Sequence, residues 1–240
     1  MIPCFFVKNQ LKWYVSTSEI GRFFTLFRRR TLFMTQYILA SASPRRKQLL
    51  EQIGLTFTIL PSNAEEIITK TKPSEVVIEL SNLKCFDIAN QITQNTLTNS
   101  NLGNDTIVIG ADTIVSYSDQ ILGKPADAQD AFEMLKNLSN HCHSVFTGVT
   151  LAHIKDQAIV QHISFYEETK VYMKEFSDSL IHSYIASGEC LDKAGAYGIQ
   201  GLGCILVDHI EGDYNNVVGL PVSRLYDILQ TFQVSHEPAK

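Results

Sequence analysis

The chain has 240 residues, of which 45% are hydrophobic and 19% charged, with a formal net charge of −5. This length and balance suit a globular protein with a sizeable core. No uncharged apolar stretch approaches the roughly 18 to 20 residues that span a bilayer, so we expect a soluble protein without a membrane partner. The five cysteines form no C-x-x-C pair, which argues against a disulfide framework or zinc knuckle and favours a reducing, cytoplasmic location.

The charge is distributed unevenly along the chain. Residues 1–33 hold six of the 20 Lys and Arg and one of the 25 Asp and Glu, which leaves 14 basic and 24 acidic residues, a net charge of −10, for residues 34–240. The first 33 residues mix scattered aromatic residues with an arginine run and show no regular period. We interpret residues 1–33 as a non-native or disordered extension, with a basic targeting segment as the alternative, and residues 34–240 as a single domain. The acidic body argues against nucleic acid as a partner.

Apolar runs alternate with helical patterns along residues 34–240. The strands are expected at 37–40, 56–60, 106–109, 145–151 and 203–207, and the helices at 45–53, 75–91, 126–138, 178–187 and 221–232. Such alternation predicts an α/β fold. The polar stretch 93–104 predicts a surface loop between helix and strand, and the tail after Phe232 is expected to fray.

The first strand runs directly into a helix start that carries hydroxyls and arginines. Ser43 is a favourable N-cap, and Pro44 suits the first helical position because it lacks the amide that would be unpaired there. The helix start offers free N–H groups and the positive end of the helix dipole, to which Ser41, Arg45 and Arg46 add donors and charge. The pattern therefore predicts a binding site for an oxyanion such as phosphate.

A single carboxylate, Asp112, stands within the apolar run 106–115. Burying it would require a cation, a metal ion or several N–H donors. The alternative is an Asp at a strand end that caps a turn after Gly110. A Gly-Lys-Pro motif follows a predicted hairpin at 118–120 and would present the ammonium group of Lys124 to a pocket.

Two glycine-containing segments and a histidine pair complete the candidates. Segment 192–201 would project Lys193, Tyr197 and Gln200 from a tight loop, yet it fits neither the dinucleotide-binding nor the P-loop pattern, and segment 212–221 predicts a loop packed on the core. The alternation of His141-Cys-His143 would put both imidazoles on one face of a strand, where they could form a pair of metal ligands. Because no third ligand is evident, we favour the interpretation that His143 packs in the core or forms a hydrogen bond.

Taken in order, these motifs resemble the Maf family of nucleoside triphosphate pyrophosphatases from about Tyr37 to Phe232. The motifs are Leu39-Ala-Ser-Ala-Ser-Pro-Arg-Arg46, Gly110-Ala-Asp-Thr113, Gly123-Lys-Pro125, Thr147-Gly-Val149, Asp192-Lys-Ala-Gly-Ala-Tyr-Gly-Ile-Gln-Gly201 and Asn216-Val-Val-Gly-Leu-Pro221. The resemblance implies a two-lobed, mixed-sheet α/β fold with a central cleft, related to inosine triphosphate pyrophosphatases. It also implies hydrolysis of a nucleoside triphosphate to the monophosphate and pyrophosphate with Mg²⁺ or Mn²⁺, and frequent homodimers.

The resemblance also assigns roles to individual residues. It makes Asp112 a general base or metal ligand, gives Glu66 a share of the metal, and places Lys124 among the catalytic residues. The residues expected to bind substrate are Ser41, Ser43, Arg45, Arg46, Lys84, Thr113, Lys193 and Gln200.

Substrate choice divides the family. Arg46, Thr113 and Gln200 resemble the branch that acts on dTTP and UTP, and modified pyrimidine nucleotides are included in this prediction. The first alternative is the same chemistry on another base, such as 7-methyl-GTP. The second is a nucleotide-binding regulator of septum formation that needs no catalysis, and a nucleic-acid module built on Arg45-Arg46-Lys47 is the least supported.

Overall fold

The computed structural model describes residues 35–96 and 105–234. The extension expected at residues 1–33, most of the expected loop at 93–104 and the end of the tail lie outside the described residues. All the elements below lie in the second of two units along the chain, Gln36–Lys240. Within the described ranges, none of the helices combines the length and apolar character that a bilayer crossing requires.

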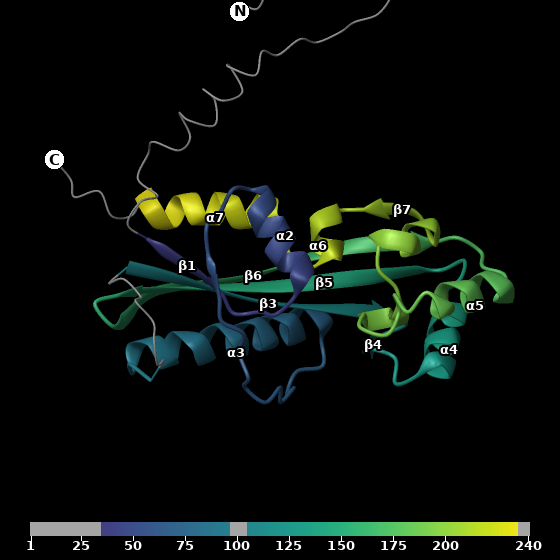
Figure 1. Cartoon of the computed structure of the whole chain (residues 1–240), viewed down its shortest axis with the longest axis horizontal. Coiled ribbons are helices and arrows are strands. Elements are labelled where there is room, and N and C mark those ends of the chain that lie inside the picture. Colours follow the sequence, from purple (N-terminus) through teal and green to yellow (C-terminus); the bar gives the residue numbers. More distant parts are fainter. Residues whose placement is uncertain (1–34, 97–104, 235–240) are drawn as a thin grey trace, which may run out of the picture. The chain divides into compact units, whose positions relative to one another are not determined.

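The second unit is built on one mixed β-sheet, as predicted (Figure 1). Its strands lie in the order β2-β1-β3-β5-β6-β7, and β4 also pairs with β3. β1 is parallel to β2 and β3, and the remaining pairs are antiparallel. The strands are β1 (Gln36–Leu39), β2 (Thr58–Ile59), β3 (Asp105–Tyr117), β4 (Gln120–Leu122), β5 (Cys142–Lys155), β6 (Ala158–Met173) and β7 (Val207–Glu211).

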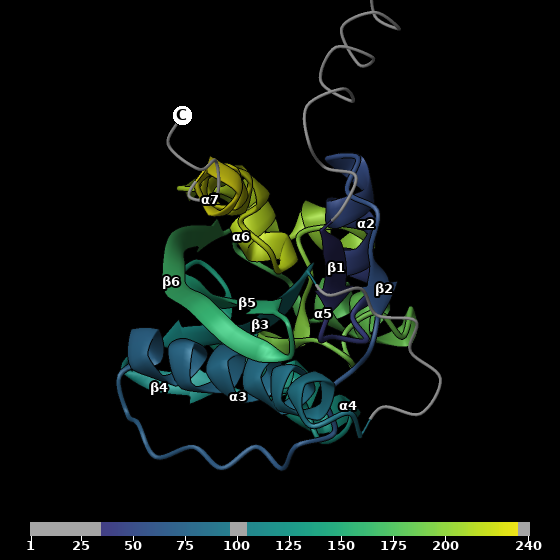
Figure 2. The same ribbon diagram turned by 90° about the vertical axis from the view of Figure 1, so that its left-hand side faces the viewer.

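Helices cover both faces of this sheet. Figure 2 shows α3 along one face and α2, α6 and α7 on the other. The helices are α2 (Pro44–Gln52), α3 (Pro73–Thr93), α4 (Ala128–Leu138), α5 (Asp178–Ala186), α6 (Tyr214–Val218) and α7 (Val222–Val234), with 3₁₀ turns η1 (Ala194–Ala196) and η2 (Gly201–Ile205).

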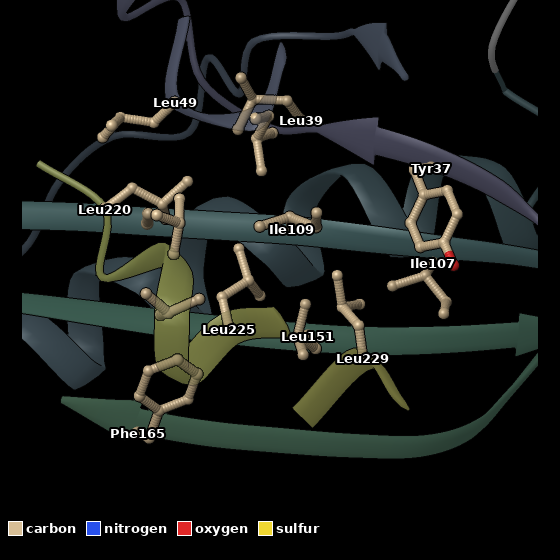
Figure 3. Packing of buried hydrophobic residues seen from close by; sticks show 14 of the residues in the cluster. Tyr37, Leu39, Leu49, Ile107, Ile109, Leu151, Phe165, Leu220, Leu225 and Leu229 are labelled. Atoms are coloured by element: carbon tan, nitrogen blue, oxygen red, sulfur yellow. The ribbon is translucent and has the colours of Figure 1, made fainter. Parts of the chain in front are cut away.

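Two apolar clusters give the unit two lobes. In the first, Leu39, Ile109 and Leu151 pack against Leu225 and Leu229 of α7 (Figure 3). The second gathers buried residues of α4, α5, the end of β3 and the segment after α5, among them Val115, Leu135, Ile181 and Tyr197. The expected mixed α/β fold with two lobes is thus confirmed.

The predicted helices are confirmed, with small shifts at their ends. The hairpin predicted at 118–120 is also confirmed, because Ser118 and Asp119 have φ of 48° and 61° between β3 and β4. The strand predicted at 203–207 is wrong, since η2 fills most of that range and β7 begins only at Val207. Segment 212–221, expected to be a loop, contains the short helix α6.

One edge of β3 is interrupted beside Asp112. β1 pairs with this edge as far as Ile109, and β4 pairs with it from Val115 onwards. Between them, no strand of the described residues pairs with this edge. The gap lies at the carboxyl end of the parallel strand β1, which is the usual place for a ligand in sheets of this kind.

Two glycines bring α3 close to the sheet. A Cβ atom at Gly148 would lie 2.2 Å from the Val77 carbonyl oxygen, and one at Gly110 would lie 2.4 Å from the Ser81 carbonyl oxygen. Any larger residue at these positions would push the helix away. Because α3 lies so close to the sheet, the side chain of its Lys84 reaches Asp112 of β3.

Candidate active site

A cleft of about 670 Å³ opens beside the gap in β3. It is lined by the loop from β1 into α2, by Lys84 in the middle of α3, by the middle of β3, and by the glycine-rich segment 192–201. All eleven residues predicted from the sequence line this cleft: Ser41, Ser43, Arg45, Arg46, Glu66, Lys84, Asp112, Thr113, Lys124, Lys193 and Gln200. The structure therefore brings them together, while their individual roles stay predictions.

The start of α2 has the predicted cap. The Ser43 hydroxyl accepts a hydrogen bond from the Arg46 amide at 3.5 Å, and Pro44 occupies the first turn. The Ser41 hydroxyl in turn accepts from the Ser43 amide at 3.3 Å. Residues 40–46 all line the cleft, so this N-terminus can present its unpaired amides to an anion.

Arg46 is buried and engaged by the protein. Its Nε donates to the Gly219 carbonyl at 2.9 Å, and its two terminal nitrogens donate to Ser41 Oγ and Thr113 Oγ1, both at 3.0 Å. Burial lowers the pKa of the guanidinium from its ordinary value. Three of its five N–H groups are used in this way, so Arg46 ties α2 to β3 and to the turn before α7. Its hydrogen bonds to the described residues leave two N–H groups for a ligand.

Thr113 is fixed from both sides. Besides Arg46, its hydroxyl lies 2.9 Å from Thr147 Oγ1 on β5, and Thr147 donates to the carbonyl of Asn216 at 2.9 Å. The side-chain amide nitrogen of Asn216, Nδ2, donates to the Val145 carbonyl at 3.0 Å. These buried contacts hold one wall of the cleft rigid.

Asp112 has the cation that its burial predicted. Its side chain is 13% exposed, and Lys84 Nζ contacts its Oδ1 while lying 2.9 Å from Glu66 Oε1. The alternative of a strand-end Asp that caps a turn is wrong, because Asp112 lies in the middle of β3 opposite Gly148. Lys84 was expected to bind substrate, and in the structure its ammonium group lies between the two carboxylates.

These two carboxylates fit a divalent metal ion. Both contact the same ammonium nitrogen, so their oxygens lie near a common point, and carboxylate oxygens are the donors that Mg²⁺ and Mn²⁺ prefer. Among the described residues no three His, Cys, Asp or Glu side chains converge. Glu66 and Asp112 would therefore share the ion with oxygens of the substrate, which is how Mg²⁺ is commonly held in nucleotide enzymes.

An ion-pair bridge connects α2 with the glycine-rich segment. Asp192 Oδ2 lies 3.3 Å from Arg45 Nη1, and its Oδ1 lies 2.6 Å from Lys193 Nζ. Partial burial opposes ionisation, but Lys193 and Arg45 together hold the pKa of Asp192 below its ordinary value. Sequence reasoning did not select Asp192, although it directly precedes Lys193. Lys124 lies exposed at the rim, without an ion pair to any described residue.

The histidine pair is not a metal site. β5 begins at Cys142, so His141 lies outside the strand, where it is exposed and packs at a tilt against Tyr117. His143 is buried, and its Nε2 lies 2.7 Å from the hydroxyl of Tyr197. The favoured interpretation, a His143 that packs or forms a hydrogen bond, is therefore confirmed, and its alternative, a pair of metal ligands, is wrong.

The comparisons of the sequence with a family model and with known proteins agree with each other. The family model described as Maf-like protein matches residues 36–232. A dTTP/UTP pyrophosphatase of Agathobacter rectalis is 51% identical over 84% of this chain and 99% of that protein. One of Bacillus cereus is 47% identical over 84% of this chain and 97% of that protein. Among solved structures, the Ham1 protein of Staphylococcus aureus matches 84% of this chain and 100% of that chain, with 11% identity and a TM-score of 0.43.

Proposed function

The chain belongs to the Maf family, and from this premise we propose that it hydrolyses dTTP and UTP, including modified pyrimidine nucleotides, to the nucleoside monophosphate and pyrophosphate. The observation that carries the proposal is the convergence of Asp112, Glu66 and Lys84 beside the start of α2 in one cleft. Acidic, basic and anion-binding groups then surround a volume that suits a nucleoside triphosphate. High identity to the relatives over nearly their whole length supports the same conclusion.

The triphosphate is held by donors from two sides of the cleft. The amides at the start of α2, with Ser41 and Ser43, meet the phosphate oxygens on one side, and Arg45 and Lys193 meet them on the other. Binding the substrate releases Arg45 and Lys193 from Asp192, so the two cations exchange one carboxylate for phosphate oxygens.

Hydrolysis requires a water molecule directed at the α-phosphorus and stabilisation of the pyrophosphate that leaves. Asp112 orients this water and accepts its proton. Lys84 and Lys124 stabilise the charge that develops on the phosphate oxygens. A Mg²⁺ or Mn²⁺ ion held by Asp112 and Glu66 would supply further charge neutralisation.

The base is selected by Gln200. Its amide offers one donor and one acceptor face to a pyrimidine edge, and the residue is half-buried and lines the cleft. Arg46 and Thr113 line the same cleft and are held by hydrogen bonds to each other and to the protein. The proposal extends to a cytoplasmic enzyme that forms homodimers and does not bind nucleic acid, in line with the net charge of −10 in residues 34–240, 14 basic against 24 acidic residues.

The experiment is pyrophosphate release by the full chain with Mg²⁺ or Mn²⁺ from dTTP, UTP, CTP, GTP, ITP and 7-methyl-GTP. We expect dTTP and UTP to be preferred. Activity on another base alone would keep the reaction and reject the pyrimidine preference. Absence of release from every nucleotide would reject the enzyme and favour a nucleotide-binding regulator.

A further inference from the structure

His143 and Tyr197 form a buried polar pair just behind the cleft. They are 3% and 5% exposed, Nε2 lies 2.7 Å from the tyrosine hydroxyl, and the rings meet edge to face with centroids 5.3 Å apart. His143 Nδ1 has no hydrogen-bond partner in the described part of the chain. Among the described residues, the Tyr197 hydroxyl is thus the hydrogen-bond partner of the His143 ring. Burial also lowers the pKa of His143 to about 4, so the imidazole is neutral at physiological pH.

Tyr197 belongs at once to the core and to the cleft. Its ring packs in the second apolar cluster with Val115 and Tyr184, while the residue itself lines the cleft three positions before Gln200. The intervening backbone of residues 198–200 also lines the cleft. A shift of the Tyr197 ring would therefore move the Gln200 side chain.

Other contacts hold this segment at its two ends. The Gly195 amide donates to the Gly123 carbonyl at 3.0 Å, and the Leu202 amide donates to the Glu189 carboxylate at 3.0 Å. Between these points the Gly198 amide makes a longer bond, 3.3 Å, to the hydroxyl of Tyr184. His143 supplies the short side-chain contact at the middle of the segment. It belongs to the central strand β5 and does not line the cleft, so a bound substrate need not displace it.

We propose that His143 and Tyr197 are positioning residues that set the depth of residues 198–200 in the cleft, and thereby make Gln200 select uracil and thymine bases over cytosine. The inference rests on the proposed function. It assigns these two residues to base selection and gives them no part in the hydrolytic step, because the hydrogen bond that joins them involves none of the proposed catalytic or phosphate-binding groups.

The test is Tyr197→Phe, which removes one oxygen and keeps the ring in the core. We expect KM for UTP to rise about three- to tenfold, as for the loss of one ordinary hydrogen bond, with kcat nearly unchanged. KM for CTP should change little, so the preference for UTP over CTP falls by the same factor. An equal loss with both nucleotides, or an unchanged preference, would overturn the proposal.

Two further variants make the test specific. Tyr172→Phe is the matched control, since Tyr172 lies on β6 away from the cleft, and it should leave the preference unchanged. The double variant His143→Phe with Tyr197→Phe should lose no more selectivity than Tyr197→Phe alone, because both changes remove the same contact. Additive losses would show that the two residues act separately and would overturn the positioning pair.

Binding of UMP and CMP by calorimetry separates failure of this inference from failure of the proposed function. A wild-type chain that binds UMP in preference to CMP without hydrolysing UTP would reject the proposed activity, and the Tyr197→Phe variant would then be judged by its binding preference. A wild-type chain that neither hydrolyses UTP nor binds either monophosphate would overturn both.

Discussion

Asp112 is paired with a lysine side chain from α3, and this pairing determines how it responds to substitution. The change Asp112→Asn keeps the shape of the side chain, while it removes the proton acceptor and one of the two carboxylates available to a metal ion. We expect pyrophosphate release to fall by about 10²- to 10⁴-fold, the usual contribution of a general base. Steady-state kinetics measures the loss, and unchanged circular dichroism shows that the fold is retained. A variant with normal turnover would remove Asp112 from the mechanism.

His143 makes stability depend on pH in a defined window. Its pKa is lowered to about 4 by burial, whereas in the unfolded chain it is near 6.5, so below pH 6.5 the unfolded state binds the extra proton first. Stability is therefore complete above pH 6.5 and is lost as the pH falls towards 4. At pH 4.5 the loss should be about 2–3 kcal/mol relative to pH 7.5.

Urea denaturation of the wild type and of His143→Phe at both pH values isolates this contribution. The variant should lose about that much less stability on acidification than the wild type, because other titrating groups are common to both proteins. Equal losses in the two proteins would mean that His143 is not held neutral in the folded state.

Residue-level prediction from the sequence worked where several motifs acted jointly. All eleven predicted residues line one cleft, because an ordered set of short motifs identifies a family even when each motif is weak. The partners of Arg46 and His143 could not be predicted in this way. Gly219 and Tyr197 lie 173 and 54 positions from them, and no local pattern encodes such contacts.

At the scale of elements, the close approach of α3 to the sheet places Lys84 in contact with Asp112. A Cβ at residue 148 would lie 2.2 Å from the carbonyl oxygen of Val77. The change Gly148→Ala should therefore force the helix away and destabilise the protein by about 2–3 kcal/mol or more. Urea denaturation at neutral pH measures the effect.

Gly123→Ala is the matched control for this prediction. A Cβ there meets no atom within 4 Å and its backbone is not in the left-handed region, so the stability should change by less than about 0.5 kcal/mol. If Gly148→Ala were as stable as the control, the close packing of α3 would not be needed by the fold.

Helices were easier to predict than strands in this chain. Amphipathic periods and caps such as Ser43, Asp127 and Ser177 are local signals, and they mark helix starts directly. β6 was not predicted, because its 16 residues mix polar and apolar side chains without a distinctive apolar run. The apolar residues at 203–207 suggested a strand, but the glycines around them favour the 3₁₀ turn that forms.

At the scale of the whole molecule, we expect the fold not to depend on the proposed metal ion. Lys84 already balances Glu66 and Asp112 without it. Chelation with EDTA should therefore stop turnover while leaving the melting temperature unchanged, and Mg²⁺ or Mn²⁺ should restore activity. Differential scanning fluorimetry and pyrophosphate release on the same samples test this. A large fall in melting temperature on chelation would show that the ion is structural.

In the proposed function, a triphosphate lies across the cleft with the anhydride bond between its α- and β-phosphates next to Asp112, and the products of dTTP hydrolysis test this arrangement most directly. We would follow the full chain with dTTP and Mg²⁺ by ³¹P NMR. We expect dTMP and pyrophosphate as the only initial products. Formation of dTDP and inorganic phosphate would mean cleavage at the other end of the triphosphate and would contradict this arrangement.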